Sequence, residues 1–67
     1  MYYRYRLCAR YNNDIVFDHL FPSVNSAIKC ASGLNLDCLY VSMFDDLNQS
    51  FFGHDFISRL VKEFKND

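Results

Sequence analysis

The most constraining feature of this sequence is the strict alternation of residues 2–11, YYRYRLCARY. The alternation produces two interleaved sets of side chains. The first set is mostly apolar and consists of Tyr3, Tyr5, Leu7, Ala9 and Tyr11. The second set carries three arginines and consists of Tyr2, Arg4, Arg6, Cys8 and Arg10. A period of two with many tyrosines is typical of a strand that is buried on one face and solvated on the other.

The segment that follows predicts a β-hairpin. Asn12 to Asp14 tolerate left-handed backbone, and residues 15–21, IVFDHLF, have the composition of a second strand. A three-residue loop places the apolar residues of both segments on one face, with the pairs Tyr11–Ile15, Ala9–Phe17, Leu7–His19 and Tyr5–Phe21. A two-residue loop would instead turn Asp14 and Asp18 toward that face. Because a slip of one residue reverses every side chain, the three-residue loop is favoured.

The next segment predicts a short helix and a buried strand. Pro22 ends the hairpin, Ser23 can cap a helix over residues 24–32, and Gly33 suits the position after its C-terminus. Residues 36–44, LDCLYVSMF, have the composition of a buried strand, and residues 45–48 form a polar turn.

The C-terminal part predicts an amphipathic helix over residues 54–65. Its apolar residues recur at helical spacing and are Phe56, Ile57, Leu60, Val61 and Phe64. Residues 50–52, SFF, are either a short fourth strand or the start of this helix.

The predicted fold is therefore a single α+β domain over residues 1–67, in the order β-β-α-β-(β)-α. An antiparallel sheet of three to four strands has both helices packed on one face, because each amphipathic element must bury its apolar side. A core of this size leaves a net stability of roughly 3–5 kcal/mol. Little of the chain is left to line a deep pocket.

Several classes of function are not supported by the sequence. Cys8, His19, Cys30 and Cys38 show no metal-ligand spacing, and no catalytic or cofactor motif is present, so we expect a protein that is not an enzyme and binds no metal or cofactor. Three scattered cysteines predict free thiols and a cytoplasmic location. The N-terminus does not resemble a signal peptide, and no apolar run approaches the ~20 residues that cross a bilayer, so we expect no membrane partner.

The face of the sheet away from the helices is the predicted binding surface. Its candidate residues combine arginines with aromatic rings and are Tyr2, Arg4, Arg6, Arg10, Tyr40 and Phe44. Arg and Tyr are enriched at protein interfaces, which favours another protein, one with an acidic surface, or a second copy of the chain. Arginine with aromatic rings also suits single-stranded nucleic acid, the less favoured alternative because of nearby acids and a net charge of −1. A face that is merely solvated is the third possibility.

The acidic pair Asp45 and Asp46 is a secondary candidate, as an acidic knob for a basic partner. In size and composition alone, the chain is similar to the small accessory proteins of bacteriophages and mobile elements. Many of these, anti-restriction and anti-CRISPR proteins among them, mask the surface of a host protein. The resemblance implies an inhibitory binding module and carries over no functional residue.

Overall fold

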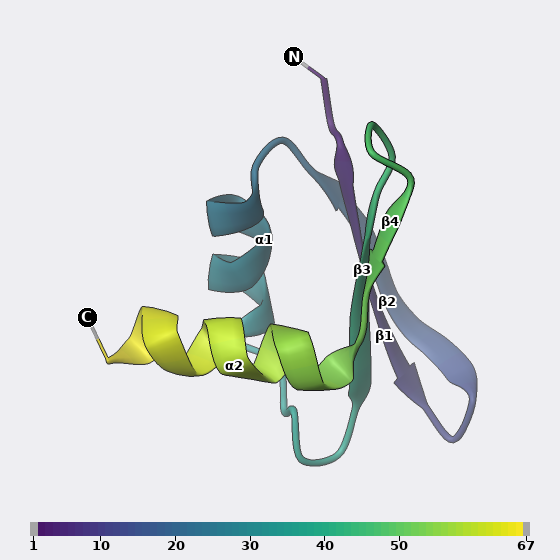
Figure 1. The fold of residues 1–67 in the computed structure, drawn as a ribbon. Helices are drawn as coiled ribbons and strands as arrows, with labels where there is room; N and C mark the ends of the chain where they lie inside the picture. Colours follow the sequence, from purple (N-terminus) through teal and green to yellow (C-terminus); the bar gives the residue numbers. More distant parts are fainter. Residues whose placement is uncertain (1, 67) are drawn as a thin grey trace.

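The computed structural model describes residues 2–66 and has the predicted α+β architecture. Its elements are β1 (Tyr5–Tyr11), β2 (Asp14–Phe21), α1 (Val24–Ala31), β3 (Tyr40–Asp45), β4 (Ser50–Phe52) and α2 (His54–Lys65). The strands form one antiparallel sheet in the order β2-β1-β3-β4. Both helices lie on the same side of this sheet (Figure 1). Residues 50–52 are therefore a strand, which completes the order β-β-α-β-β-α.

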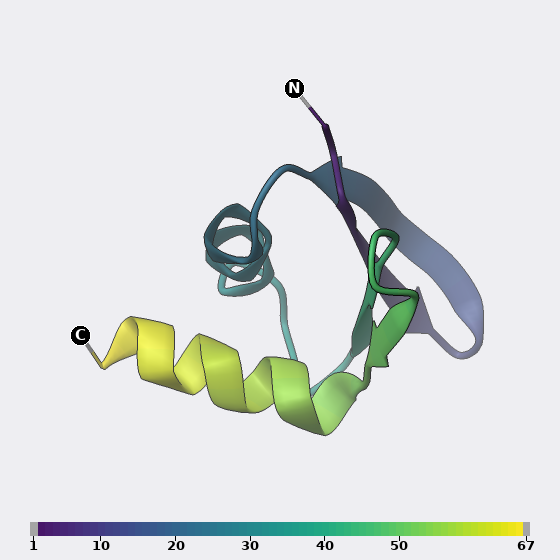
Figure 2. The ribbon, with the colours of Figure 1, turned by 45° about the horizontal axis from the view of Figure 1, so that its top comes forward.

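The core lies between the sheet and the two helices. Its buried residues come from β1, α1, β3 and α2 and are Leu7, Ala9, Ala27, Ile28, Ala31, Val41, Met43, Ile57 and Val61. The helix α1 packs against the sheet, whereas α2 begins beside the strands and runs away from them past α1 (Figure 2). Neither helix lies on the opposite side of the sheet, so within residues 2–66 no helix covers that face (Figures 1 and 2).

The hairpin has the predicted faces but a different turn. The pairs Tyr5–Phe21, Leu7–His19 and Ala9–Phe17 are confirmed. The prediction of a three-residue loop is wrong, because Tyr11 pairs with Asp14 around a two-residue turn. Asn12 and Asn13 both have positive φ, 50° and 69°, which is the conformation that two-residue hairpin turns require.

A β-bulge reconciles this shorter turn with the predicted faces. The register shifts between Ala9 and Arg10, so that Arg10 pairs with Ile15 and Val16 is the extra residue of β2. Ile15 therefore lies opposite Arg10 and not opposite Tyr11 as predicted, and its side chain is exposed.

The third strand is shorter than the predicted 36–44, because residues 36–39 form a turn. The Asn35 side-chain oxygen accepts the N–H of Asp37, and the Asn35 carbonyl accepts the N–H groups of Cys38 and Leu39. These hydrogen bonds fold the backbone into a turn, so the same backbone groups do not pair with a neighbouring strand. The leucines that suggested a strand, Leu36 and Leu39, still pack against the core from this turn.

The helices begin as expected but differ in detail. Ser23 caps α1, and the Ser26 side chain completes a reciprocal capping box. The helix α1 ends at Ala31 with Ser32 as its C-cap, and Gly33 does not use the positive φ that glycine allows. In α2, Ile57 and Val61 are buried as predicted, but Phe56 and Phe64 are exposed, because α2 leans away from the sheet. Phe56 stacks on Phe52 of β4 instead, with ring centroids 5.2 Å apart.

Candidate protein-binding surface

The open face of the sheet is built from the residues that alternate with the core residues. Because opposite residues on paired strands share a face, the strand register orders these side chains into rows across the sheet. The row at one end is Leu20, Arg6, Phe44 and Phe51, the middle row is Asp18, Cys8 and Ser42, and the row at the other end is Ile15, Arg10 and Tyr40. We call these ten positions, together with the bulge residue Val16 of β2, the open face.

The row that contains Arg6 is the most apolar part of the open face. Arg6 lies between Leu20 on one side and Phe44 on the other, and Phe51 continues the row onto β4. Phe51 is 62% exposed and Leu20 is 46% exposed, whereas Phe44 is half-buried. The row therefore presents a guanidinium flanked by apolar surface, which is the chemistry of interface anchors.

The middle row carries the only acid of the open face. Arg6 Nε lies 3.2 Å from Asp18 Oδ1, and both side chains remain well exposed, at 55% and 41%. Burial, and secondarily the charge of Asp18, raises the pKa of the Cys8 thiol. This thiol therefore stays protonated and is a poor nucleophile or metal ligand.

The third row ends at the start of α2. Tyr40 stacks on His54 with ring centroids 5.4 Å apart, and Nδ1 of His54 accepts the backbone N–H of Val41 at 3.0 Å. This contact holds the half-exposed ring of Tyr40 in place at the margin of the sheet. Arg10, the other polar member of the row, forms no ion pair within residues 2–66.

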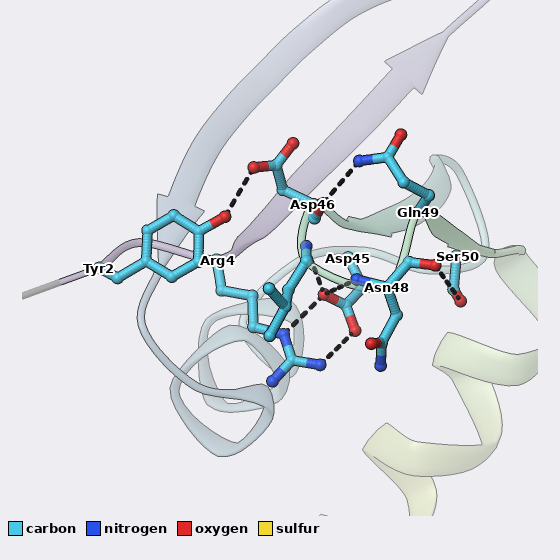
Figure 3. A network of polar contacts seen from close by, with 8 residues as sticks. Tyr2, Arg4, Asp45, Asp46, Asn48, Gln49 and Ser50 are labelled. Carbon is cyan, nitrogen blue, oxygen red and sulfur yellow. Dashed lines mark hydrogen bonds and ion pairs between the residues drawn. The ribbon is translucent and has the colours of Figure 1, made fainter.

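Arg4 does not belong to the open face, contrary to the sequence prediction. Its Nε and Nη2 donate to Oδ1 and Oδ2 of Asp45 at 2.6 and 2.8 Å (Figure 3). Arg4 precedes the first residue of β1, so the alternation that orients Arg6 and Arg10 does not govern it. Its guanidinium also lies over the ring of Tyr5, 5.0 Å from the centroid.

The acidic knob predicted for Asp45 and Asp46 is also wrong for Asp45. The Asp45 side chain is only 4% exposed, and its Oδ1 additionally accepts the N–H groups of Leu47 and Asn48. The hydrogen bond from Arg4, supported by those backbone donors, lowers the pKa of this carboxyl group. Asp45 is thus a structural centre of the β3–β4 turn.

Asp46 is exposed and accepts the hydroxyl of Tyr2 at 2.7 Å (Figure 3). This hydrogen bond raises the pKa of Tyr2. Of the six predicted binding residues, Arg6, Arg10, Tyr40 and Phe44 therefore share the open face, and Tyr2 and Arg4 belong to the network around the β3–β4 turn.

Other kinds of site find less support. Within residues 2–66, no three His, Cys, Asp or Glu side chains are grouped as a metal ion would need. No helix in this part of the chain has the length and apolar character to cross a membrane. A shallow cleft of about 430 Å³ lies between residues 34–37 and α2, and its one imidazole, His54, already accepts the Val41 N–H.

Comparison with protein-family models, with curated proteins and with solved structures returns no match.

The sequence prediction missed one exposed ring of the surface, Phe51, because the register of β4 depends on the length of the preceding turn. The pairing of Phe44 with Phe51 identifies it.

Proposed function

We propose that this protein is a non-enzymatic binding module that docks on another protein through the open face. The observation that carries the proposal is the row in which exposed Leu20 and Phe51 flank the guanidinium of Arg6. Arginine and aromatic side chains are enriched at protein interfaces, because arginine joins a long apolar stem to a charged group and an aromatic ring offers a large, rigid contact area.

Charge indicates the kind of partner. The open face carries two arginines and one acid, Asp18, which already forms an ion pair with Arg6. Arg10 has no such partner among the described residues and is free to meet an external carboxylate. A protein with an acidic patch would neutralise this cation and would be steered toward it.

Nucleic acid fits the same surface less well. With Arg4 bound to Asp45, only two arginines remain to meet phosphates, and Asp18 lies beside one of them. Affinity for nucleic acid depends chiefly on the number of phosphates neutralised.

The resemblance to phage accessory proteins extends the proposal to an inhibitory role, in which the bound module covers a working surface of its partner.

Affinity capture with paired variants tests the proposal. Wild-type protein, Arg6→Glu and Lys65→Glu are immobilised and exposed to cell lysate with and without nuclease treatment, and the affinity of any retained protein is then measured with purified components. Arg6→Glu reverses a charge in the most apolar row of the open face and should weaken binding about tenfold or more, equivalent to ~1.4 kcal/mol. Lys65→Glu makes the same charge change near the end of α2, remote from that face, and should bind like wild type.

Three results would contradict the proposal. Equal binding by both variants would mean that the open face takes no part. Retention that disappears with nuclease treatment, and has a steep dependence on salt, would favour nucleic acid. Binding that leaves the activity of an enzymatic partner unchanged would remove the inhibitory role alone.

A further inference from the structure

The strand β2 forms an uncovered edge of the sheet. It is the outermost strand in the order β2-β1-β3-β4, and no other element of residues 2–66 lies beyond it (Figure 2). Alternate residues of such a strand direct their backbone N–H and C=O groups outward, where another strand can pair with them. The opposite edge, β4, has only three residues, whereas β2 has eight.

The edge also lacks most of the features that prevent strand pairing. Proteins commonly protect exposed edges with lysine, proline or a bulge. Between Ile15 and Phe21 there is no lysine or proline, and Asp18 is the one carboxylate. The bulge at Val16 and the proline at position 22 confine the regular edge to five residues, Phe17–Phe21.

We propose that two copies of this chain associate through these edges. In the proposed dimer, Phe17–Phe21 of one copy pairs antiparallel with the same segment of a second copy, about a two-fold axis at His19. The two four-stranded sheets become one continuous sheet. The contact uses the backbone edge of β2 and leaves the open face of the sheet uncovered, so this inference does not rest on the proposed function.

The register follows from symmetry and charge. A two-fold axis perpendicular to the sheet must pass through a residue position, because paired residues share a face. An axis at Asp18 would place two carboxylates opposite each other, which is unfavourable. An axis at Leu20 would place Asp18 opposite the proline, which has no N–H to donate. An axis at His19 uses the whole regular segment and pairs Asp18 with Leu20 of the second copy.

The side chains of the edge suit this register. On the helix side of β2, Phe17, His19 and Phe21 form an aromatic row, with centroid distances of 5.2 Å from Phe17 to His19 and 6.4 Å from His19 to Phe21. Pairing about His19 sets each Phe17 opposite Phe21 of the second copy. Cross-strand aromatic pairs of this kind stabilise antiparallel sheets. His19 itself is exposed, so the helices leave the centre of the proposed contact accessible.

Disulfide trapping tests both the contact and its register. In a chain carrying Cys8→Ser, Cys30→Ala and Cys38→Ser, single cysteines are introduced by His19→Cys, Asp18→Cys or Leu20→Cys. Residues directly opposite have Cβ atoms about 4.5–5.5 Å apart, close to the separation a disulfide needs. We expect the His19→Cys chains to cross-link roughly tenfold faster than either control, because the dimer raises their effective concentration. Equal rates at the three positions would indicate random collision, and faster linkage at 18 or 20 would overturn the register.

Sedimentation equilibrium tests the association with the native cysteines in place. The wild-type mass should rise with concentration from 7.9 kDa toward twice that value. His19→Lys sets two ammonium groups opposite each other and should keep the chain monomeric, while its circular dichroism stays that of wild type because the site is exposed. Arg6→Glu should dimerise like wild type. A wild-type chain that remains monomeric up to about 1 mM, or a dimer that is lost in Arg6→Glu and kept in His19→Lys, would overturn the inference.

Discussion

The two sides of the sheet place the same kind of ion pair in different surroundings. On the helix side, Arg4 makes two hydrogen bonds to Asp45, whose side chain is almost fully buried. On the open side, Arg6 makes one longer contact to Asp18, and both side chains remain in solvent. Burial decides what each arginine can do, because a buried pair must stay together whereas an exposed pair can exchange its partner at little cost.

Substitutions on the helix side should lower the free energy of unfolding more than substitutions on the open face, and a matched pair of leucines measures the difference. Leu7 is fully buried, so Leu7→Ala should lower the free energy of unfolding by about 2–5 kcal/mol. That loss is comparable to the whole stability of a domain of this size. Leu20→Ala makes the same change on the open face and should stay within about 0.5 kcal/mol of wild type. Urea unfolding followed by circular dichroism compares the two, and equal losses would refute the distinction between the faces.

The partly buried ion pair of Arg4 and Asp45 should be the next most sensitive feature. Asp45→Asn keeps the shape of the side chain but leaves the Arg4 guanidinium without its anion. We expect the melting temperature to fall by about 5 °C or more. The control, Asp46→Asn, alters an exposed acid that is bound to Tyr2 alone through its side chain, and should melt close to wild type. A melting temperature for Asp45→Asn equal to that control would show that the pair is dispensable.

The same pair predicts part of the acid sensitivity. The pKa of Asp45 is lower in the folded chain than in the unfolded chain, chiefly because Arg4 donates to it. Its contribution to stability is therefore complete above the unfolded value, near pH 4, and is lost as the pH falls through the folded value. As the pH falls below about 5, Asp45→Asn should lose less stability than wild type, because the variant has no carboxylate to protonate at this position. Parallel pH profiles would mean that Asp45 does not titrate as a folded-state ion pair.

The sequence predicted the faces of β1 because alternation is a property of the strand itself. Arg6 and Arg10 lie within the strand and have the predicted orientation, whereas Arg4 lies before its first residue and turns toward Asp45. The burial of Asp45 had a signal in the sequence, since this residue alternates with Val41 and Met43, two apolar residues of the segment with buried-strand composition. The bulge at Val16 had no such signal, because no residue type marks it.

The smallest expected effect concerns the exposed pair itself. Because Arg6 and Asp18 are both well solvated, their coupling should contribute only ~0.2–1 kcal/mol to folding. A double-mutant cycle with Arg6→Ala, Asp18→Ala and the double variant isolates this term, and about 1 M salt should reduce it further. A coupling well above ~1 kcal/mol would mean that the pair has a structural role like that of Arg4 and Asp45. A small coupling leaves Arg6 free to exchange Asp18 for a carboxylate of a partner, and the same Arg6→Ala variant should then lose far more in binding than in folding.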